Sequence, residues 1–171
     1  MRILHKCKNI FIDFDGVIVD SNRFKEKAIE KSIFKLSGNN KNSKEAVNYF
    51  NANAGISRKE KLSKFFDEKD VLEIMKIYAK ECDNFFSTAI PTEGLVSFLE
   101  YIQLRNKHIK IYILSGGEKN EINLFLRQNN LFQFFDDILS SEQNKLDHIK
   151  KKKVSENDIF IGDSKNDLIT S

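Results

Sequence analysis

The chain has 171 residues, of which 40% are hydrophobic and 31% charged, as in an ordinary globular protein with one main domain and a small additional element. A net charge of +3 argues against nucleic-acid binding, and no apolar run reaches the roughly 18 residues of a membrane span. We therefore expect a cytoplasmic protein with neither nucleic-acid nor membrane partners, and its two distant cysteines argue against a disulfide framework or a zinc site.

The first predicted element is a strand at residues 9–14, an apolar run that contains Asp13, continues to Asp15 and breaks at Gly16. A continuous apolar run of this length is typical of a strand covered on both faces, as in parallel sheets. Burying carboxylates costs free energy unless a cation or hydrogen-bond donors compensate them. The two aspartates therefore indicate either a bound partner or a chemical role.

Residues 21–87 predict helices alone. Apolar side chains recur there at helical intervals, and Ser57 followed three residues later by Glu60 is a capping-box signature at the start of one helix. Because no strand signal interrupts this stretch, we expect a separate helical subdomain inserted after the first strand.

After the helical stretch, predicted helices alternate with strands at residues 110–114, 137–139 and 158–161, of which the middle one is the weakest. Such alternation favours parallel strands joined by helical crossovers, which is an α/β fold. We expect residues 1–20 and 88–171 to form this domain together.

Polar residues follow directly after the ends of predicted strands: Asp13 and Asp15, then residues 115–117, then Asp163 with Asp167. Ligands of open parallel sheets bind beyond the carboxyl ends of the strands, so these distant segments are expected to converge. Four carboxylates in one place would raise one another's pKa values unless a cation joined them. Oxygen ligands without histidine or thiolate predict Mg²⁺ as that cation.

The turn Ser115-Gly116-Gly117 leads into a predicted helix and offers backbone N–H groups to an anion. Lys145, which follows the weak strand, is expected to add a fixed positive charge, with Lys150 as the alternative lysine. A phosphoryl group is the anion that suits such a site.

Taken in order, "DFDGVIVDS", "LSGG", a lysine and "GDSKND" resemble the four motifs of the haloacid dehalogenase-like (HAD) superfamily, in its phosphatase and β-phosphoglucomutase-like branch. The helical insert resembles the type-I cap of that family, so the resemblance covers nearly the whole chain. It implies a Rossmann-like three-layer sandwich with a mostly parallel sheet and a small all-helical cap.

The resemblance also implies a catalytic role for each matching residue. Asp13 would attack phosphorus to form an aspartyl-phosphate, and Asp15 would act as general acid and then as general base. Ser115 and Gly116 would bind phosphoryl oxygens, and Lys145 would neutralise their charge.

Mg²⁺ would be held by Asp13, by Asp163 and by the carbonyl of Asp15, while Asp167 would orient the metal or its waters. The acid at Asp15 favours an oxygen leaving group over dehalogenation, so the expected activity is hydrolysis of a small phosphorylated metabolite. Two alternatives stay open: a phosphomutase of the β-phosphoglucomutase type, and a catalytically silent module that binds a phosphorylated ligand.

In the helical insert, the segment "GISRKEKL" has two interpretations of equal weight. In one, Gly55 allows the backbone to approach the substrate, and Arg58 and Lys59 bind a second anionic group, as in a sugar phosphate. In the other, Ser57 and Glu60 merely cap a helix and the basic side chains are solvated.

The chain stops four residues after Asp167, where members of the family usually continue through a helix and a further strand. We therefore expect a catalytic domain truncated at its C-terminus. Neither the identity of the substrate nor the oligomeric state is indicated by the sequence.

Overall fold

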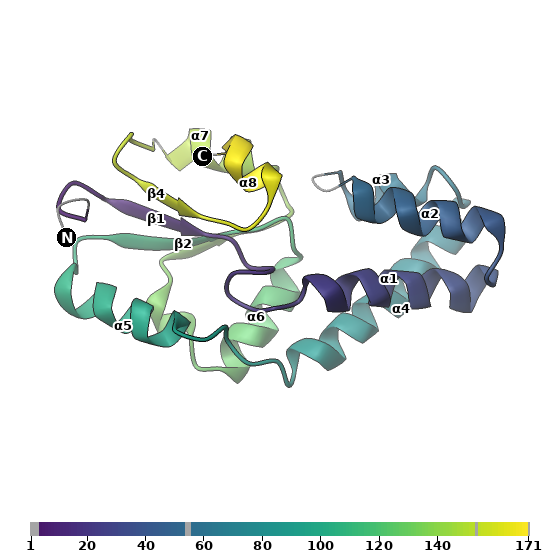
Figure 1. Cartoon of the computed structure of the whole chain (residues 1–171), viewed down its shortest axis with the longest axis horizontal. Coiled ribbons are helices and arrows are strands. Elements are labelled where there is room, and N and C mark those ends of the chain that lie inside the picture. The colour runs from purple at the N-terminus through teal and green to yellow at the C-terminus, as the bar shows by residue number, and fades with distance from the viewer. Residues whose placement is uncertain (1–3, 54–55, 153, 171) are drawn as a thin grey trace. The chain divides into compact units, whose positions relative to one another are not determined.

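The computed structural model of the chain describes residues 4–53, 56–152 and 154–170. It divides into two compact units, coloured along the chain in Figure 1. The first, here called the sheet unit, comprises Met1–Asp20 and Ser87–Ser171, and the second, the helical unit, comprises Ser21–Phe86.

The sheet unit is built on four strands: β1 (Asn9–Ile12), β2 (Lys110–Leu114), β3 (Asp137–Leu139) and β4 (Ile159–Ile161). Their order in the sheet is β3-β2-β1-β4, and every neighbouring pair is parallel. The prediction of an α/β fold with a mostly parallel sheet is therefore confirmed.

Helices cover both faces of this sheet. In Figure 1, α5 (Leu95–Arg105) and α6 (Lys119–Gln128) lie on one face, and α7 (Lys145–Lys152) and α8 (Lys165–Thr170) lie on the other. A short 3-10 helix, η1 (Phe132–Phe134), precedes β3. This is the three-layer arrangement that the family resemblance implies.

The core explains why the strands are continuous apolar runs. On the α7 side, Phe11 stacks on Tyr112 with ring centroids 5.2 Å apart, and both pack in a cluster that includes Leu114, Leu139 and Phe160. Alternate residues point to the opposite face, and these are also buried: Ile10, Ile12, Ile111 and Ile113. Both faces of the central strands therefore need apolar side chains.

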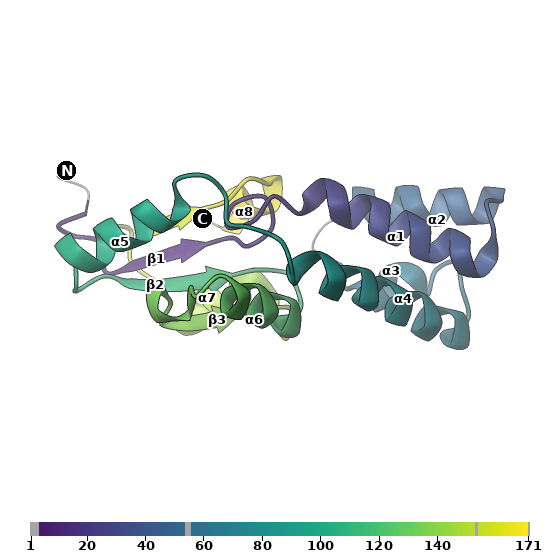
Figure 2. The same cartoon turned by 90° about the horizontal axis from the view of Figure 1, so that it is seen from below.

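The helical unit contains α1 (Asn22–Ser37), α2 (Lys41–Ala52), α3 (Arg58–Leu62) and α4 (Glu68–Phe86), and its described residues include no strand. Figure 2 shows α1 running alongside α4, and Phe24 of α1 stacks on Phe85 of α4 with ring centroids 4.1 Å apart. The buried residues of α4 recur every three or four positions and so form one face of the helix: Val71, Ile74, Tyr78, Cys82 and Phe86.

None of the helices in the described parts of the chain combines the length and the apolarity that crossing a membrane requires.

Candidate active site

Asp13 directly follows β1 and remains bonded to the sheet, because its N–H donates to the carbonyl of Ile161 at 2.8 Å. Its side chain is buried, and Oδ1 accepts the N–H of Phe14 at 2.7 Å. The chain then turns through Gly16, whose φ of 80° lies in the left-handed region that favours glycine. The neighbouring Asp15 is half-buried at the start of this turn.

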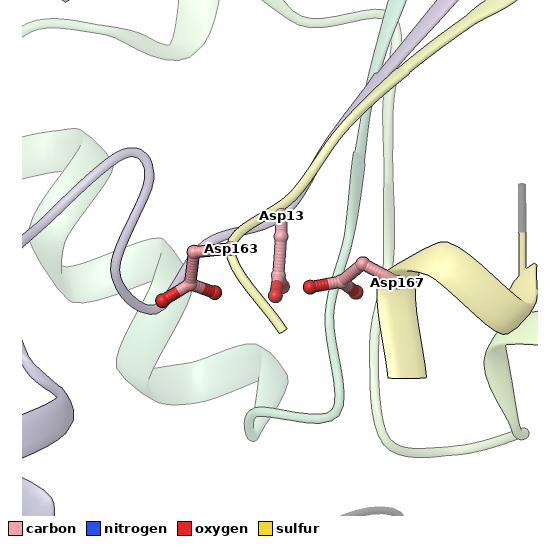
Figure 3. A group of neighbouring side chains, drawn as sticks. All are labelled: Asp13, Asp163 and Asp167. Carbon is pink, nitrogen blue, oxygen red and sulfur yellow. The ribbon is translucent and has the colours of Figure 1, made fainter. Parts of the chain in front are cut away.

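Figure 3 shows that three of the predicted carboxylates meet at the carboxyl end of the sheet. Asp13, Asp163 and Asp167 each offer one oxygen, and these oxygens lie within 4.8 Å of one another. They come from the end of β1, the turn after β4 and the first turn of α8. The side chain of Asp15 is not in this group.

Lys145 is the first residue of α7 and reaches two of these aspartates. Its Nζ lies 3.0 Å from Oδ2 of Asp13 and 2.5 Å from Oδ1 of Asp167. Lys150, the alternative lysine, is exposed in the last turn of the same helix. Of these two lysines, the structure therefore brings Lys145 into the candidate site.

Three carboxylates gather here among the described residues, and Lys145 contacts two of them. Burial raises the pKa of Asp13 to about 7, and the charge of Asp167 adds to the rise, although Lys145 opposes it. Burial also acts to raise the pKa of Asp167, but hydrogen bonds from Lys145 and Ser164 outweigh it and hold that pKa below its ordinary value. A divalent cation with oxygen ligands, such as Mg²⁺, fits these donor atoms.

The position of Asp167 is fixed by residues that sequence reasoning did not assign to the site. Ser164 donates to Oδ2 of Asp167 from its N–H at 3.0 Å and from its hydroxyl at 2.6 Å. A Cβ at Gly162 would lie only 2.4 Å from Cβ of Asp167, so this position requires glycine. The sequence signal that could have identified Gly162 is its place directly after an apolar strand and five residues before Asp167.

The predicted anion-binding turn follows β2. The N–H of Ser115 donates to the carbonyl of Leu139 at 2.9 Å, and its buried hydroxyl oxygen accepts the N–H of Gly117 at 2.9 Å. That hydroxyl keeps its own proton as a donor. Gly116 is exposed between them, and the turn leads into α6 as predicted.

Arg58 belongs to the helical unit, where it is the first residue of α3 and its guanidinium lies 4.9 Å from the centre of the Tyr78 ring. The side chain of Ser57 accepts the N–H of Glu60 at 3.2 Å, so the predicted cap is present. Lys59 pairs with Glu68 at 3.7 Å on the surface. Gly55, which was expected to let the backbone approach the substrate, lies outside the described residues.

Two sequence comparisons bear on these observations. The model of the haloacid dehalogenase-like hydrolase family matches residues 10–171. None of the curated proteins compared with the chain matches it.

Many solved structures have a similar fold, and for three of them the protein's name includes an activity or a bound metal. The chain is 14% identical to a Lactobacillus plantarum protein assigned as a phosphoglycolate phosphatase, with a TM-score of 0.68 over 96% of this chain and 81% of that one. It is 17% identical to a Thermotoga maritima protein assigned as a β-phosphoglucomutase, with a TM-score of 0.63 over 95% and 79% of the two chains. It is also 17% identical to a HAD hydrolase of Bacillus subtilis solved with bound magnesium, with a TM-score of 0.63 over 96% and 85%.

Proposed function

The chain belongs to the haloacid dehalogenase-like hydrolases, and from that premise we propose that it is a Mg²⁺-dependent phosphatase that hydrolyses a small phosphomonoester through an aspartyl-phosphate on Asp13. The observation that carries the proposal is the contact of Lys145 with both Asp13 and Asp167, beside Asp163. Carboxylates and one fixed ammonium group in this arrangement suit a phosphoryl group together with a divalent cation.

In the first proposed step, a carboxylate oxygen of Asp13 bonds to phosphorus while the bond from phosphorus to the ester oxygen breaks. Asp15 gives its proton to the departing oxygen, so the alcohol leaves uncharged. In the second step a water molecule attacks phosphorus and Asp15 takes the proton from that water. The bond between phosphorus and Asp13 then breaks, which releases inorganic phosphate and restores both carboxyl groups.

The proposed phosphoryl contacts are Ser115, the N–H of Gly116 and the ammonium group of Lys145. Ser115 is held by the sheet, since its N–H is bonded to the carbonyl of Leu139, and its hydroxyl keeps a proton to donate. Lys145 already faces Asp13, so it can neutralise charge on the nucleophile and on the transferred group alike.

Asp13, Asp163 and the carbonyl of Asp15 are the proposed ligands of Mg²⁺, with Asp167 orienting the metal or its waters. The ion would supply positive charge that offsets the carboxylates and the phosphoryl oxygens. The oxygen-only donor set supports this choice, as does the magnesium named for the Bacillus subtilis structure. The proposed substrate is a small phosphorylated metabolite, and Arg58 remains the proposed contact for a second anionic group.

The test is hydrolysis of an aryl phosphate with Mg²⁺ and with a chelator. We expect turnover only with Mg²⁺, and we expect Asp13→Asn to lower it by at least about 10³-fold because the nucleophile is lost. Asp83→Asn, a change on the exposed face of α4, is the matched control and keeps full activity. Absence of turnover in the folded wild-type protein with Mg²⁺ would support a phospho-ligand-binding module instead.

A phosphomutase is the second candidate, because one structure of similar fold is assigned as a β-phosphoglucomutase. The two reactions differ in what accepts the phosphoryl group from Asp13. In ¹⁸O-labelled water a phosphatase incorporates the label into released phosphate, whereas a mutase returns the phosphoryl group to a sugar phosphate without incorporation.

A further inference from the structure

Lys145 must be held accurately, because its ammonium group meets two aspartates that come from different elements. The helix that carries it, α7, has only eight residues, and a helix of this length is not stable alone in water. Its apolar contact with the sheet comes from the partly buried Ile149, while Leu146 is 43% exposed. The orientation of Lys145 therefore depends on how α7 is attached to its surroundings.

His148 is the buried residue of α7. Its Nε2 lies 2.9 Å from the carbonyl oxygen of Ser140, and because a carbonyl only accepts, Nε2 carries the donated proton. Ser140 is fully buried just after β3, and the other bond recorded to its carbonyl, from the N–H of Gln143, is long at 3.4 Å. Loss of the His148 bond would leave this carbonyl poorly satisfied.

The segment that receives the bond also holds the proposed phosphoryl-binding turn. Leu139 accepts the N–H of Ser115 at 2.9 Å, and the N–H of Ser141 donates to the carbonyl of Gly117 at 3.0 Å. One side of this segment is thus bonded to the turn, and the other side is bonded to His148. The histidine links the element that carries Lys145 to the element that carries Ser115.

The other side-chain bonds described for α7 stay close to the helix or are exposed, although Lys152 also reaches β3 and lies 4.6 Å from the centre of the Tyr112 ring. Asn144 accepts the N–H of Asp147 at 2.9 Å, which caps the helix locally. Lys151 bonds to Gln143 at 2.6 Å, and Lys152 bonds to Asp137 at 3.0 Å, but both bonds are exposed and such pairs contribute little.

We propose that His148 is a positioning residue, whose hydrogen bond to Ser140 sets the place of Lys145 relative to Asp13 and to the 115–117 turn. His148 lies three residues after Lys145, close to one helical turn, so the bond restrains the same side of α7 from which Lys145 extends. The effect of this restraint on catalysis rests on the proposed function, whereas its effect on Lys145 does not.

Three substitutions separate the hydrogen bond from packing. His148→Gln keeps an N–H donor at similar reach, His148→Asn shortens that reach, and His148→Leu fills the space without a donor. The first readout is the rate at which acetic anhydride acylates Lys145, measured by mass spectrometry relative to the exposed Lys150 of the same helix. We expect the ratio to rise about fivefold in the Asn and Leu variants and to stay near wild type in the Gln variant.

The second readout is kcat/KM for an aryl phosphate with Mg²⁺, measured in the wild-type background and in the Lys145→Met background. We expect the Asn and Leu substitutions to lower kcat/KM about tenfold in the first background and not at all in the second. Their effect on the free energy of unfolding is expected to persist in both backgrounds.

An unchanged acylation ratio in the folded Asn and Leu variants would overturn the proposal, as would an equal fall in kcat/KM in both backgrounds. If the Asn and Leu variants fail to fold while the Gln variant folds, the role of His148 is global stability and the proposal is wrong. If the wild-type protein hydrolyses no phosphate ester, the proposed function fails, and the acylation ratio still decides the role of His148.

Discussion

Gly162 and Asp167 share a space too small for one more carbon atom. A Cβ at position 162 would come within 2.5 Å of Cγ of Asp167, so Gly162→Ala must displace that carboxylate. We expect weaker Mg²⁺ binding and an activity loss of about 10²-fold, because a displacement near 1 Å in a catalytic group has that effect. Calorimetry with Mg²⁺ and kcat/KM for an aryl phosphate would measure the two effects.

The control for Gly162→Ala is Gly38→Ala in the helical unit. Gly38 has a φ of 73° and open space around its Cα, so an alanine there strains the backbone without a steric clash. It should lower the free energy of unfolding by about 1 kcal/mol and leave Mg²⁺ binding unchanged. Equal Mg²⁺ affinities in the two variants would contradict the role given to Gly162.

Lys61 is a buried charge of the helical unit, 7% exposed, with Nζ donating to the carbonyl of Phe50 at 3.1 Å. Burial, and secondarily the charge of Arg58, lower the pKa of Lys61 to about 8 from 10.5. Between these values the unfolded chain binds more protons than the folded chain, so this group makes the free energy of unfolding rise with pH through that window.

We expect Lys61→Met to remove this rise, and urea unfolding of both proteins below and above the window would measure it. Relative to Lys61→Met, the wild-type protein should therefore become more stable as the pH rises through the window. Lys44→Met, at an exposed position of α2, is the control and should follow the wild-type pH dependence. Parallel curves for Lys61→Met and wild type would show that the lysine is not desolvated.

The residues of the candidate site differ in how well the sequence predicts them. Asp13, Lys145, Asp163 and Asp167 are predictable because each follows or lies near a strand end, and the parallel sheet brings those ends together. Gly162, Ser164 and His148 act through contacts with neighbours, and residue type alone does not reveal which neighbour they meet.

At the scale of elements, Asp158 joins the start of β4 to the start of β1. Its carboxylate accepts the N–H groups of Lys8 at 3.1 Å, Asn9 at 2.8 Å and Ser155 at 2.9 Å, and the side-chain amide of Asn9 at 2.9 Å. Burial acts to raise the pKa of Asp158, but these hydrogen bonds outweigh it and hold the pKa below 3.8. This set of hydrogen bonds to Asp158, here called the Asp158 clamp, therefore stabilises the pair of strands β1 and β4, after which Asp13 and Asp163 follow.

Asp158→Ala should lower the free energy of unfolding by roughly 2 kcal/mol at neutral pH, because several donors lose a charged acceptor. Since the folded-state pKa is depressed, this stabilisation is present above 3.8 and is lost as the pH falls through the lower folded-state value. Urea unfolding at neutral and acidic pH would measure both effects, with Asp83→Ala as the control. A difference from wild type that does not shrink in acid would contradict the clamp.

The first strand is shorter than its apolar pattern predicts. The pattern predicts a first strand at 9–14, but β1 ends at Ile12 and only the N–H of Asp13 continues the pairing. Phe14 is buried like its predecessors, yet its carbonyl accepts the N–H groups of Ile18 and Val19 in the turn that follows. An apolar pattern shows which side chains are buried. The strand itself ends where the backbone groups form hydrogen bonds within the turn and no longer with the neighbouring strand.

At the scale of the whole molecule, Mg²⁺ should couple the charge of the site to global stability. The raised pKa of Asp13 means that charging this group destabilises the metal-free protein as the pH rises from 3.8 to about 7. Mg²⁺ needs the ionised carboxylate, so we expect its affinity to increase with pH through the same range. Ligand binding at about 100 times its Kd would add about 2.7 kcal/mol to the free energy of unfolding.

Thermal unfolding with Mg²⁺ and with a chelator, at several pH values, would measure this coupling. Asp163→Asn should abolish the stabilisation by Mg²⁺, whereas Asp83→Asn should retain it. Stabilisation of the Asp163 variant to the wild-type extent would place the ion elsewhere in the molecule.

The convergence of distant segments is the part of the whole-molecule arrangement that the sequence predicts best, since it follows from the alternation of helices and strands. The spatial order β3-β2-β1-β4 is harder to predict from the sequence, because short apolar strands carry little information about which strand each pairs with. The link from His148 to Ser140 lies within the connection from β3 to α7, and it was not predicted.

The bond between the N–H of Asp13 and the carbonyl of Ile161 has a consequence for biosynthesis. It joins β1 to a strand that follows much later in the sequence, so one side of β1 stays unpaired during synthesis until β4 has been made. A nascent chain interrupted before that point contains Asp13 but lacks Asp163 and Asp167. The three carboxylates can therefore come together only after β4 has joined the sheet.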